Sequence, residues 1–456
     1  MRRFLFVVIE SSLLLLCGFF ALYVRVLGET GYELVERRGW MKIIVVTSVI
    51  QMAFYLFDLY DLLSTRRYRR VVTNMAIALG VATVLLSLLF YLVPALSLGR
   101  GIFLVMIAFG SGVIPGWRLL VAWSAGHPQL GVRERVLILG SGTQAVEVAR
   151  ATLERRNAGF HIVGFADSDP ALIGKSLINP SVIGLTDDVA NLVEEFQVDR
   201  IVVAVEDRRG KFPTAELLDL TLSGRVAVEE CAQYYERLTG KIASEMLRPS
   251  WLIFSRNSRY SNVVHHVRRV LNAGLAVVGF ILSLPLMLLT AIAVTLDSAG
   301  PIVYTQERVG KNGRTFRMIK FRSMRTDAEK NGAVWAMASD PRVTRVGRII
   351  RKLRLDELPQ FINVMRGDMN FVGPRPERPV FVAQLEKEIP YYSQRHLVKP
   401  GLTGWAQIKY PYGASVEDAM EKLRYDLYYI KNQNLLLDAG IIFETVKTVL
   451  FGRGGR

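Results

Sequence analysis

Two adjacent carboxylates, Asp356 and Glu357, lie between leucines in the stretch LRLDELPQF, residues 353–361. Carboxylate oxygens are ligands that Mg²⁺ prefers, so such a pair can anchor a divalent cation. A second explanation is also open, because two acids before a proline are common in a solvated turn or in the first turn of a helix. The segments around the pair must decide between chemistry and a surface turn.

Basic residues and rigid turns occur on both sides of this pair. The stretch RTFRMIKFRSM alternates Lys320 and Arg322 with apolar residues. The stretch NFVGPRPERP places Arg375 between two prolines, which fix the backbone and limit the entropy lost when a guanidinium binds a phosphate. The stretch KPGLTGWAQI adds a rigid glycine-containing loop. Together they predict a phosphate-binding pocket in which an acidic pair lies in a cationic frame, where substrate phosphates can complete the shell of a cation.

The composition indicates a membrane protein with several domains. The chain has 456 residues, 51% of them hydrophobic, and 57 Lys and Arg against 41 Asp and Glu give a net charge of +16. Such a surplus suits anionic lipid, phosphorylated substrates or nucleic acid. No zinc-finger spacing or RNA-binding aromatic motif accompanies it, so we expect no nucleic acid partner. Two cysteines, Cys17 and Cys231, are too few for a disulfide framework or a cysteine metal site.

Four apolar runs near the N-terminus are each long enough to cross a bilayer, which needs about 20 apolar residues. They cover residues 1–26, Met41–Tyr60, Thr73–Leu96 and Gly101–Trp123. The first run lacks a small-residue cleavage site and three more follow, so it is not a signal peptide. Basic residues precede the first run and form STRRYRR between the second and the third. The four runs predict a four-helix transmembrane domain, residues 1–125. The positive-inside rule places both ends of this domain in the cytoplasm.

Residues 133–245 have the pattern of a small Rossmann-like α/β domain. A buried strand, a glycine turn, an amphipathic helix and a second strand that ends in acids follow one another. Gly140, Gly142 and Ala145 supply a G-x-G-x-x-A spacing, and Asp167 ends the second strand. The glycines can bring a pyrophosphate to the helix N-terminus while Asp167 binds a ribose hydroxyl. They can equally serve only to make the tight turn, and the sequence leaves both explanations open.

A fifth apolar segment, residues 270–296, is long enough to span a bilayer, but basic residues flank both of its ends. Ser283 and Pro285 lie near its middle, where the proline removes a backbone hydrogen bond and the serine hydroxyl can satisfy a freed carbonyl. We therefore expect a re-entrant helix, about residues 268–297, that enters the membrane, bends at these residues and returns to the same face. The alternative is an ordinary spanning helix with a proline kink.

Residues 258–456 resemble the catalytic domain of the monotopic phosphoglycosyl transferases, the bacterial sugar transferases that begin exopolysaccharide or O-antigen assembly. The motifs that carry the resemblance are the Ser-Pro helix, KFRSM, LRLDELPQFINVMRGDMNFVGPRP, KPGLTGWAQI and RYDLYYIKN. Long-form members of this family also have four transmembrane helices and a nucleotide-binding-like domain, so the resemblance covers nearly the whole chain. The implied fold is a membrane protein with a mixed α/β cytosolic catalytic domain.

The resemblance implies transfer of a hexose-1-phosphate from a UDP-hexose to undecaprenyl phosphate, at the cytoplasmic face of the bacterial inner membrane. Asp356 would attack the phosphate that bears the sugar, expel UMP and carry a covalent phosphosugar until the lipid phosphate accepts it. Glu357 would help to hold Mg²⁺ or remove the acceptor's proton, so both acids are expected metal ligands. UDP-glucose and UDP-galactose are the first donors to consider, and pairing into a homodimer is left open.

The same resemblance supplies the remaining candidate site residues. The expected phosphate ligands are Arg375, Arg322, Lys320 and Arg351, with Pro374 and Gln407 beside them. The re-entrant helix would keep this pocket at the membrane interface, where a lipid phosphate can reach it without leaving the bilayer.

Two other classes of function stay open at this point. A membrane-tethered nucleotide-sugar dehydratase or epimerase would fit four helices and a glycine-rich α/β unit, but no Tyr in the chain has a Lys four residues later. A sensor or scaffold of a polysaccharide assembly complex would fit the helices and the middle domain. It would not explain an acidic pair in a cationic pocket.

Overall fold

The computed structural model describes most of the chain. The described residues are 2–25, 38–57, 59–60, 68–97, 99–126, 134–155, 159–205, 212–243, 262–328, 340–410, 413 and 415–450. Part of the basic stretch STRRYRR and the expected domain start at residue 258 lie outside them. Residues 139–151, 202–210 and 228–456 form one compact unit, and the remainder of the chain forms another.

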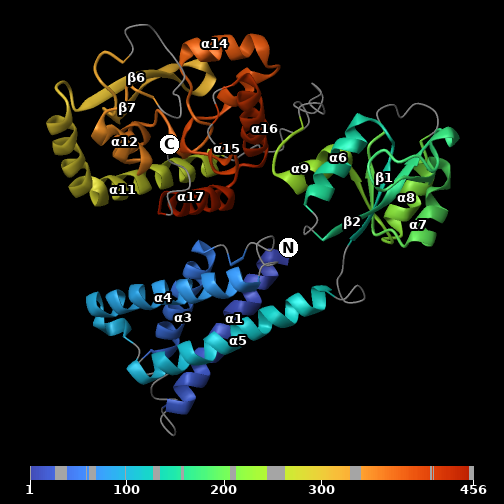
Figure 1. Ribbon diagram of the computed structural model, residues 1–456, viewed down its shortest axis with the longest axis horizontal. Helices are drawn as coiled ribbons and strands as arrows, with labels where there is room; N and C mark the ends of the chain where they lie inside the picture. Colours follow the sequence, from blue (N-terminus) through green and yellow to red (C-terminus); the bar gives the residue numbers. More distant parts are fainter. Residues whose placement is uncertain are drawn as a thin grey trace. The chain divides into compact units, whose positions relative to one another are not determined.

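Four helices form the N-terminal part of the chain (Figure 1). They are α1 (Arg2–Arg25), α3 (Gly39–Leu56), α4 (Tyr68–Leu92) and α5 (Arg100–Gly126), with a short 3₁₀ helix, η2 (Pro94–Leu96), before the last. Each contains an apolar stretch of 18 to 21 residues, long enough to cross a membrane. One hydrophobic cluster joins buried side chains of all four, among them Leu14, Ile43, Ala82 and Met106. The four apolar runs of the sequence are therefore helices that pack on one another.

A five-stranded sheet follows, with the strand order β3-β2-β1-β4-β5. Its strands are β1 (Glu134–Leu139), β2 (Phe160–Asp167), β3 (Val182–Leu185), β4 (Arg200–Val203) and β5 (Ala227–Glu230). Between and after them come α6 (Thr143–Glu154), η3 (Pro170–Leu172), η4 (Thr186–Asp188), α7 (Val189–Phe196), α8 (Thr214–Leu222) and α9 (Cys231–Thr239). β2 and β3 pair in parallel, and an order with β1 at the centre is that of a doubly wound domain. The parallel α/β fold predicted for this region is confirmed.

The C-terminal part contains two small strand pairs surrounded by helices. β6 (Val303–Val309) and β7 (Thr315–Phe321) are antiparallel, whereas β8 (Asn370–Val372) and β9 (Gly401–Thr403) are parallel. The helices are α11 (Asn262–Asp297), α12 (Arg345–Lys352), α13 (Gln360–Arg366), α14 (Pro379–Glu388), α15 (Trp405–Lys409), α16 (Val416–Asn432) and α17 (Leu435–Leu450). Short 3₁₀ helices occupy turns, namely η6 (Lys311–Gly313), η7 (Leu355–Glu357) and η8 (Tyr392–Leu397).

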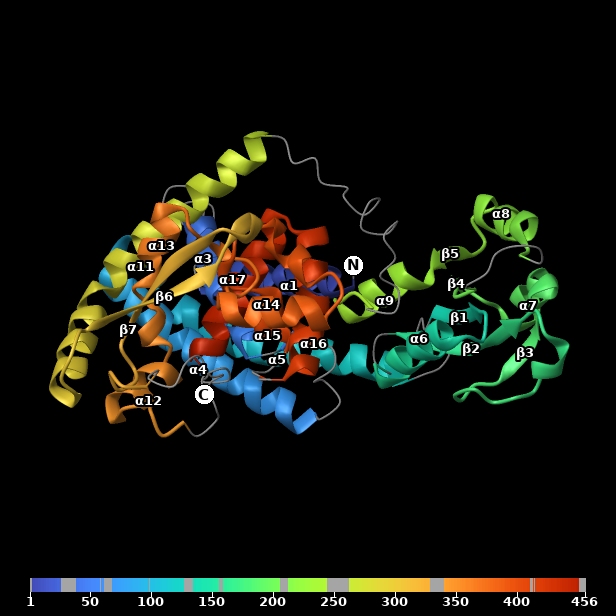
Figure 2. The ribbon, with the colours of Figure 1, turned by 90° about the horizontal axis from the view of Figure 1, so that it is seen from above.

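The longest helix, α11, is the fifth segment apolar enough to cross a membrane, and it changes direction within its length (Figures 1 and 2). Pro285 lies inside it, and the Ser283 hydroxyl donates to the carbonyl of Phe280 at 3.0 Å. A serine that bonds a backbone carbonyl beside a proline is one way in which apolar helices tolerate a kink. The two residues expected at the bend therefore lie within the helix in suitable positions.

Both halves of α11 pack on the same C-terminal domain. Before Pro285, the side chain of Asn272 accepts a hydrogen bond from Phe371 N of β8 at 2.7 Å. After it, Val294 packs against Phe321 of β7. A straight helix of 36 residues would be about 54 Å long. The contacts therefore agree with a helix that bends.

Candidate active site

A sharp turn presents the acidic pair. α12 ends before Arg354, which has a left-handed conformation with φ of 54°. The chain then forms η7, which carries Asp356 and Glu357, and Pro359 leads directly into α13. This is the turn before a helix that the surface explanation expects. The acids are nevertheless not solvated, because Asp356 is only 9% exposed and the Glu357 side chain 13%.

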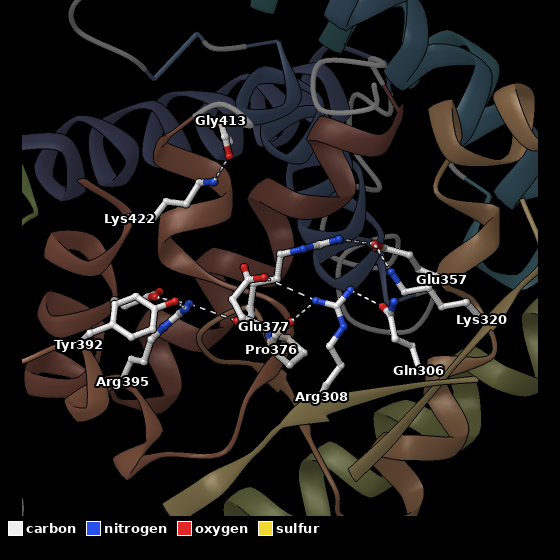
Figure 3. Close-up of polar contacts among 12 residues, drawn as sticks. Gln306, Arg308, Lys320, Glu357, Pro376, Glu377, Tyr392, Arg395, Gly413 and Lys422 are labelled. Atoms are coloured by element: carbon white, nitrogen blue, oxygen red, sulfur yellow. Dashed lines mark hydrogen bonds and ion pairs between the residues drawn. The ribbon is translucent and has the colours of Figure 1, made fainter. Parts of the chain in front are cut away.

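Glu357 is surrounded by cations from three segments, and Figure 3 shows Lys320 beside it. Its Oε1 accepts a hydrogen bond from Arg375 Nη2 at 3.2 Å and lies 3.9 Å from Lys320 Nζ of β7. Its Oε2 lies 3.7 Å from Arg354 Nη1. The structure therefore brings together the acidic pair, the basic strand and the arginine between prolines, as the sequence motifs suggest.

The two carboxyl groups of the pair have different electrostatic environments. Burial and the neighbouring charge of Glu357 raise the pKa of Asp356 above its usual value. Burial acts on Glu357 as well, but the charges of Arg375, Lys320 and Arg354 outweigh it and lower the pKa of that carboxyl. Burial also lowers the pKa of Lys320, to about 8. Glu357 is thus a fixed anion among cations, whereas Asp356 is a more basic carboxylate.

Three other expected phosphate-binding residues lie at different places. Arg351 belongs to α12, and its charge partly offsets the rise in the pKa of the first carboxyl of the pair. Pro374 is buried, and its carbonyl accepts a hydrogen bond from Gly401 N at 2.9 Å. Gln407 belongs to α15, where its Nε2 donates to Leu402 O at 3.4 Å. Arg351 therefore contributes to the field of the pair, and Pro374 shapes the backbone next to Arg375.

Arg322 has a different place from the one expected. It is 5% exposed, and its guanidinium donates to Ala299 O at 2.6 Å and to Ser298 O at 2.5 Å. These carbonyls follow the C-terminus of α11, where a cation satisfies free carbonyl groups and opposes the helix dipole. Strand β7 ends at Phe321, so Arg322 no longer follows the alternation that directs Lys320 toward the pair. Arg322 therefore caps the C-terminal end of α11, and its expected role as a phosphate ligand stays a prediction.

The acidic pair offers only part of a magnesium site. Among the described residues, no group of three or more His, Cys, Asp or Glu side chains is arranged to hold a metal ion. Glu357 already has three cationic neighbours, which leaves Asp356 as the carboxylate with more available oxygens. Mg²⁺ is commonly bound by one or two carboxylates together with substrate phosphates and water. The pair therefore fits a magnesium ion that arrives with a phosphate substrate.

The glycine turn of the α/β domain is explained by its backbone. Gly140 has a φ of 107°, and a Cβ atom there would lie 3.0 Å from the backbone of Ala204. Gly142 directly precedes α6. The carboxylate of Asp167 accepts a hydrogen bond from Asp169 N at 3.0 Å. These contacts account for the glycine and the acid as structural residues, and nucleotide binding by Gly140, Gly142 and Asp167 stays a prediction.

Three charged residues near Arg375 were not singled out by the sequence patterns: Arg308, Arg395 and Asp426. Arg308 and Arg395 lie on either side of the Pro376–Glu377 turn (Figure 3). Asp426 is 2% exposed and lies in the motif RYDLYYIKN between the buried residues Tyr425 and Leu427. An acid within such an apolar helical pattern needs a buried partner. That signal was present in the sequence and could have identified Asp426.

Two family models match the chain. The model described as bacterial sugar transferase matches residues 263–452, and the model described as CoA-binding domain matches residues 55–211. The first range contains the acidic pair and every cation around it. The second range contains α4, α5 and the first four strands of the parallel sheet.

Several curated proteins with similar sequences are named as transferases. A UDP-galactose-lipid carrier transferase of Erwinia amylovora is 31% identical over 78% of this chain and 77% of its own length. A UDP-N-acetylgalactosamine-undecaprenyl-phosphate N-acetylgalactosaminephosphotransferase of Aeromonas hydrophila is 46% identical over 51% of this chain and 54% of its own. An undecaprenyl-phosphate glucose phosphotransferase of Komagataeibacter xylinus is 33% identical over 70% of this chain and 59% of its own length. The chain thus spans little more than half the length of the Aeromonas and Komagataeibacter proteins.

Proposed function

The chain belongs to the bacterial sugar transferase family, and we propose that it transfers a hexose-1-phosphate from a UDP-sugar to undecaprenyl phosphate. The products are UMP and a polyprenyl-diphospho-sugar, the starting unit of an exopolysaccharide or O-antigen. The observation that carries the proposal is the buried pair Asp356 and Glu357 within a frame of cations. Two relatives named for transfer to undecaprenyl phosphate support the lipid acceptor.

Asp356 is the proposed nucleophile. Its carboxylate oxygen attacks the phosphorus that bears the sugar, the bond from that phosphorus to the UMP oxygen breaks, and a phosphosugar remains on the carboxylate. An oxygen of undecaprenyl phosphate then attacks the same phosphorus and releases the carboxylate. Burial raises the pKa of the Asp356 carboxyl, and Asp356 has no ion pair among the described residues. A basic carboxylate without a fixed partner supports this role.

The cations of the frame would counter the charge of the phosphates. Arg375 and Lys320 both approach the same oxygen of Glu357, so that carboxylate holds their charged groups in one place. Preorganised charges stabilise a transition state at no reorganisation cost. Asp356 with Glu357 would hold Mg²⁺ together with the phosphates, and the metal, when bound, would neutralise charge on the transferred phosphoryl group.

We place this chemistry at the cytoplasmic face of the bacterial inner membrane. α11 is proposed to be re-entrant, because residues on both sides of Pro285 pack on the C-terminal domain. Basic residues flank both ends of the segment, which the positive-inside rule assigns to one side. A spanning helix would separate its ends by the thickness of the bilayer and could not keep both sets of contacts.

Transfer of label from donor to lipid tests the proposed function. Membranes that contain the protein are incubated with Mg²⁺, undecaprenyl phosphate and radiolabelled UDP-glucose, UDP-galactose or UDP-N-acetylgalactosamine, the sugars in the names of the relatives. We expect label in the lipid phase with at least one donor and release of UMP in equal amount. Membranes with Asp356→Asn serve as the matched control. No transfer from any of the donors would reject the function and favour a scaffold.

A further inference from the structure

The loop that carries Arg375 is fixed by its carbonyl groups. The carbonyl oxygens of four successive residues, 374–377, each accept a hydrogen bond from another part of the domain. Pro374 O accepts from Gly401 N at 2.9 Å, and Arg375 O accepts from Arg395 Nη2 at 3.1 Å. Pro376 O accepts from Arg308 Nη1 at 3.0 Å, and Glu377 O accepts from Val309 N at 2.9 Å. Two of the four residues are prolines, which have no N–H to donate. The carbonyl contacts therefore determine where this loop lies.

Two of these donors are guanidinium groups, those of the buried Arg395 and the partly buried Arg308 (Figure 3). Arg395 Nη2 also binds Asp426 Oδ2 at 2.8 Å, and its Nη1 donates to the hydroxyl of Tyr392 at 2.5 Å. The side chains of Arg395 and Asp426 are 6% and 2% exposed. Burying such a pair costs desolvation free energy that an apolar pair of equal volume would avoid. Stability alone does not explain the pair, whereas its contact with the loop that carries Arg375 suggests a second role.

We infer that Arg395, held by Asp426, is a positioning residue that aims Arg375 at Glu357 and at the donor phosphates; this rests on the proposed function. Arg395 binds the carbonyl of Arg375 itself, and the Arg375 side chain reaches Glu357 at 3.2 Å. The planar guanidinium of Arg395 can bind a carboxylate and a carbonyl at the same time, whereas a lysine ammonium is a single point charge. Loss of Arg395 should therefore weaken binding of the donor phosphates only by changing the position of Arg375.

A double-mutant cycle on UMP binding tests this inference. UMP is the leaving group common to all UDP-sugars, so the cycle does not depend on the identity of the hexose. We expect Arg375→Ala to weaken UMP binding about 10- to 100-fold, the usual range for a hydrogen bond to a charged group. Arg395→Lys alone should weaken it about 10-fold or more. In the double variant, Arg395→Lys should weaken UMP binding by less than about 3-fold beyond the loss caused by Arg375→Ala. The reason is that the side chain that Arg395 positions is already gone.

Additive losses in the double variant would overturn the inference, since they would mean that Arg395 acts on the whole fold. Absence of UMP binding in the wild-type protein would instead reject the proposed donor, and the inference with it. Thermal unfolding of each variant separates folding from positioning. If Arg395→Lys does not fold, Asp426→Asn gives the same cycle, because Asp426 holds the guanidinium of Arg395.

The matched control is another buried carboxylate that belongs to an ion pair. Glu236 of α9 lies 2.9 Å from Lys431 of α16. Asp426→Asn and Glu236→Gln both replace a paired carboxylate by an amide. We expect Asp426→Asn to weaken UMP binding and Glu236→Gln to leave it unchanged. Equal losses in both variants would count against positioning.

Discussion

At the scale of single residues, the adjacent acids have unequal surroundings and should have unequal roles. Asp356→Asn keeps the shape of the side chain but removes the attacking oxyanion, so turnover should vanish. Glu357→Gln should be severe yet measurable, because metal-orienting or proton-accepting roles are partly covered by water and general-base contributions are typically ~10²- to 10⁴-fold. An exposed surface pair would shift stability by only about 0.5 kcal/mol and leave activity near normal.

Intact mass measured without lipid acceptor distinguishes these roles. With a suitable UDP-sugar, the wild-type protein should gain one hexose-phosphate and release about one UMP per active site, as expected for a covalent intermediate. Asp356→Asn should do neither. Near-normal turnover of the Asn variant would contradict the mechanism. So would a wild-type enzyme that turns over rapidly with acceptor but never carries the adduct.

A second residue-scale prediction concerns His396, which is half-buried on η8. Burial, reinforced by the charge of Arg395, lowers the pKa of His396 to about 4. An unfolded histidine has a pKa of about 6.5, so between these values the unfolded state binds more protons. The stability that depends on neutral His396 is therefore complete above pH 6.5 and is lost as the pH falls toward 4. As the pH falls across this range, the unfolding temperature should decline less in His396→Gln than in the wild-type protein. Parallel declines in the two proteins would exclude a contribution of His396 to the pH dependence of stability.

The site illustrates which residues a sequence can place. Lys320 and Arg375 were expected beside the acidic pair, because a strand alternates its side chains and prolines fix a loop. Arg322 lies only two residues after Lys320, but the strand ends between them and the alternation stops. Arg395 could not be recognised, because nothing local shows which of many arginines meets a buried acid far along the chain. Motifs indicated the side chains of the site but not the residues that hold its backbone.

At the scale of elements, the bend of α11 leads to a topological prediction. In a variant without the native cysteines, Cys17 and Cys231, single cysteines are placed before Val270 and just after Leu296. Both should be equally inaccessible to an impermeant thiol reagent in intact cells, because both ends of a re-entrant helix face the cytoplasm. Both should react after the cells are opened, which is the positive control. Labelling of only the later site in intact cells would show that the segment crosses the membrane.

A buried ion pair joins two of the N-terminal helices. Arg118 of α5 lies 2.7 Å from one carboxylate oxygen of Glu10 of α1 and 2.8 Å from the other, and the two side chains are 6% and 0% exposed. Apolar length, a local property, predicted the helices. The partners of this pair are 108 residues apart in sequence, so no local pattern predicted their contact.

Removing one member of this pair should destabilise the helices strongly. Arg118→Ala leaves Glu10 buried without its cationic partner, which typically costs about 3–5 kcal/mol. Arg118→Met combined with Glu10→Leu should recover most of that loss, because an apolar pair needs no partner. Thermal unfolding in detergent measures both. Arg225→Ala is the control, since its pair with Glu194 is 70% and 75% exposed and should matter little. Equal effects of the two single changes would refute the argument.

At the scale of the whole molecule, the α/β domain and the transferase domain share a segment. Ile242, just after α9, is 2% exposed within a cluster that contains Leu423 and Leu427 of α16. The carbonyl of Gly240 accepts a hydrogen bond from Trp405 Nε1 at 2.6 Å. The sequence predicted boundaries at residues 245 and 258, and those boundaries stay predictions. Composition could not show that the last residues of one domain belong to the hydrophobic core of the next.

This shared segment leads to a prediction about truncated proteins. A fragment that begins at Ser258 keeps every proposed catalytic residue, so it should retain transferase activity in detergent. It lacks Ile242, whose full burial is worth about 1.5–3 kcal/mol, and the hydrogen bond to Trp405. A fragment that begins at Glu230 keeps both and should therefore unfold at a higher temperature. The same fragment with Ile242→Asp is the control and should unfold near the temperature of the shorter one.

Two results would contradict this account of the molecule in different ways. Equal unfolding temperatures for the fragments that begin at Ser258 and Glu230 would mean that the shared segment adds nothing to the transferase core. Complete loss of activity in a folded Ser258 fragment would mean that the α/β domain takes part in the chemistry. Gly140, Gly142 and Asp167 would then become the first residues to substitute in the full chain. Retained activity with lower stability would instead assign the domain to support or regulation, because the site would be complete without its glycine turn.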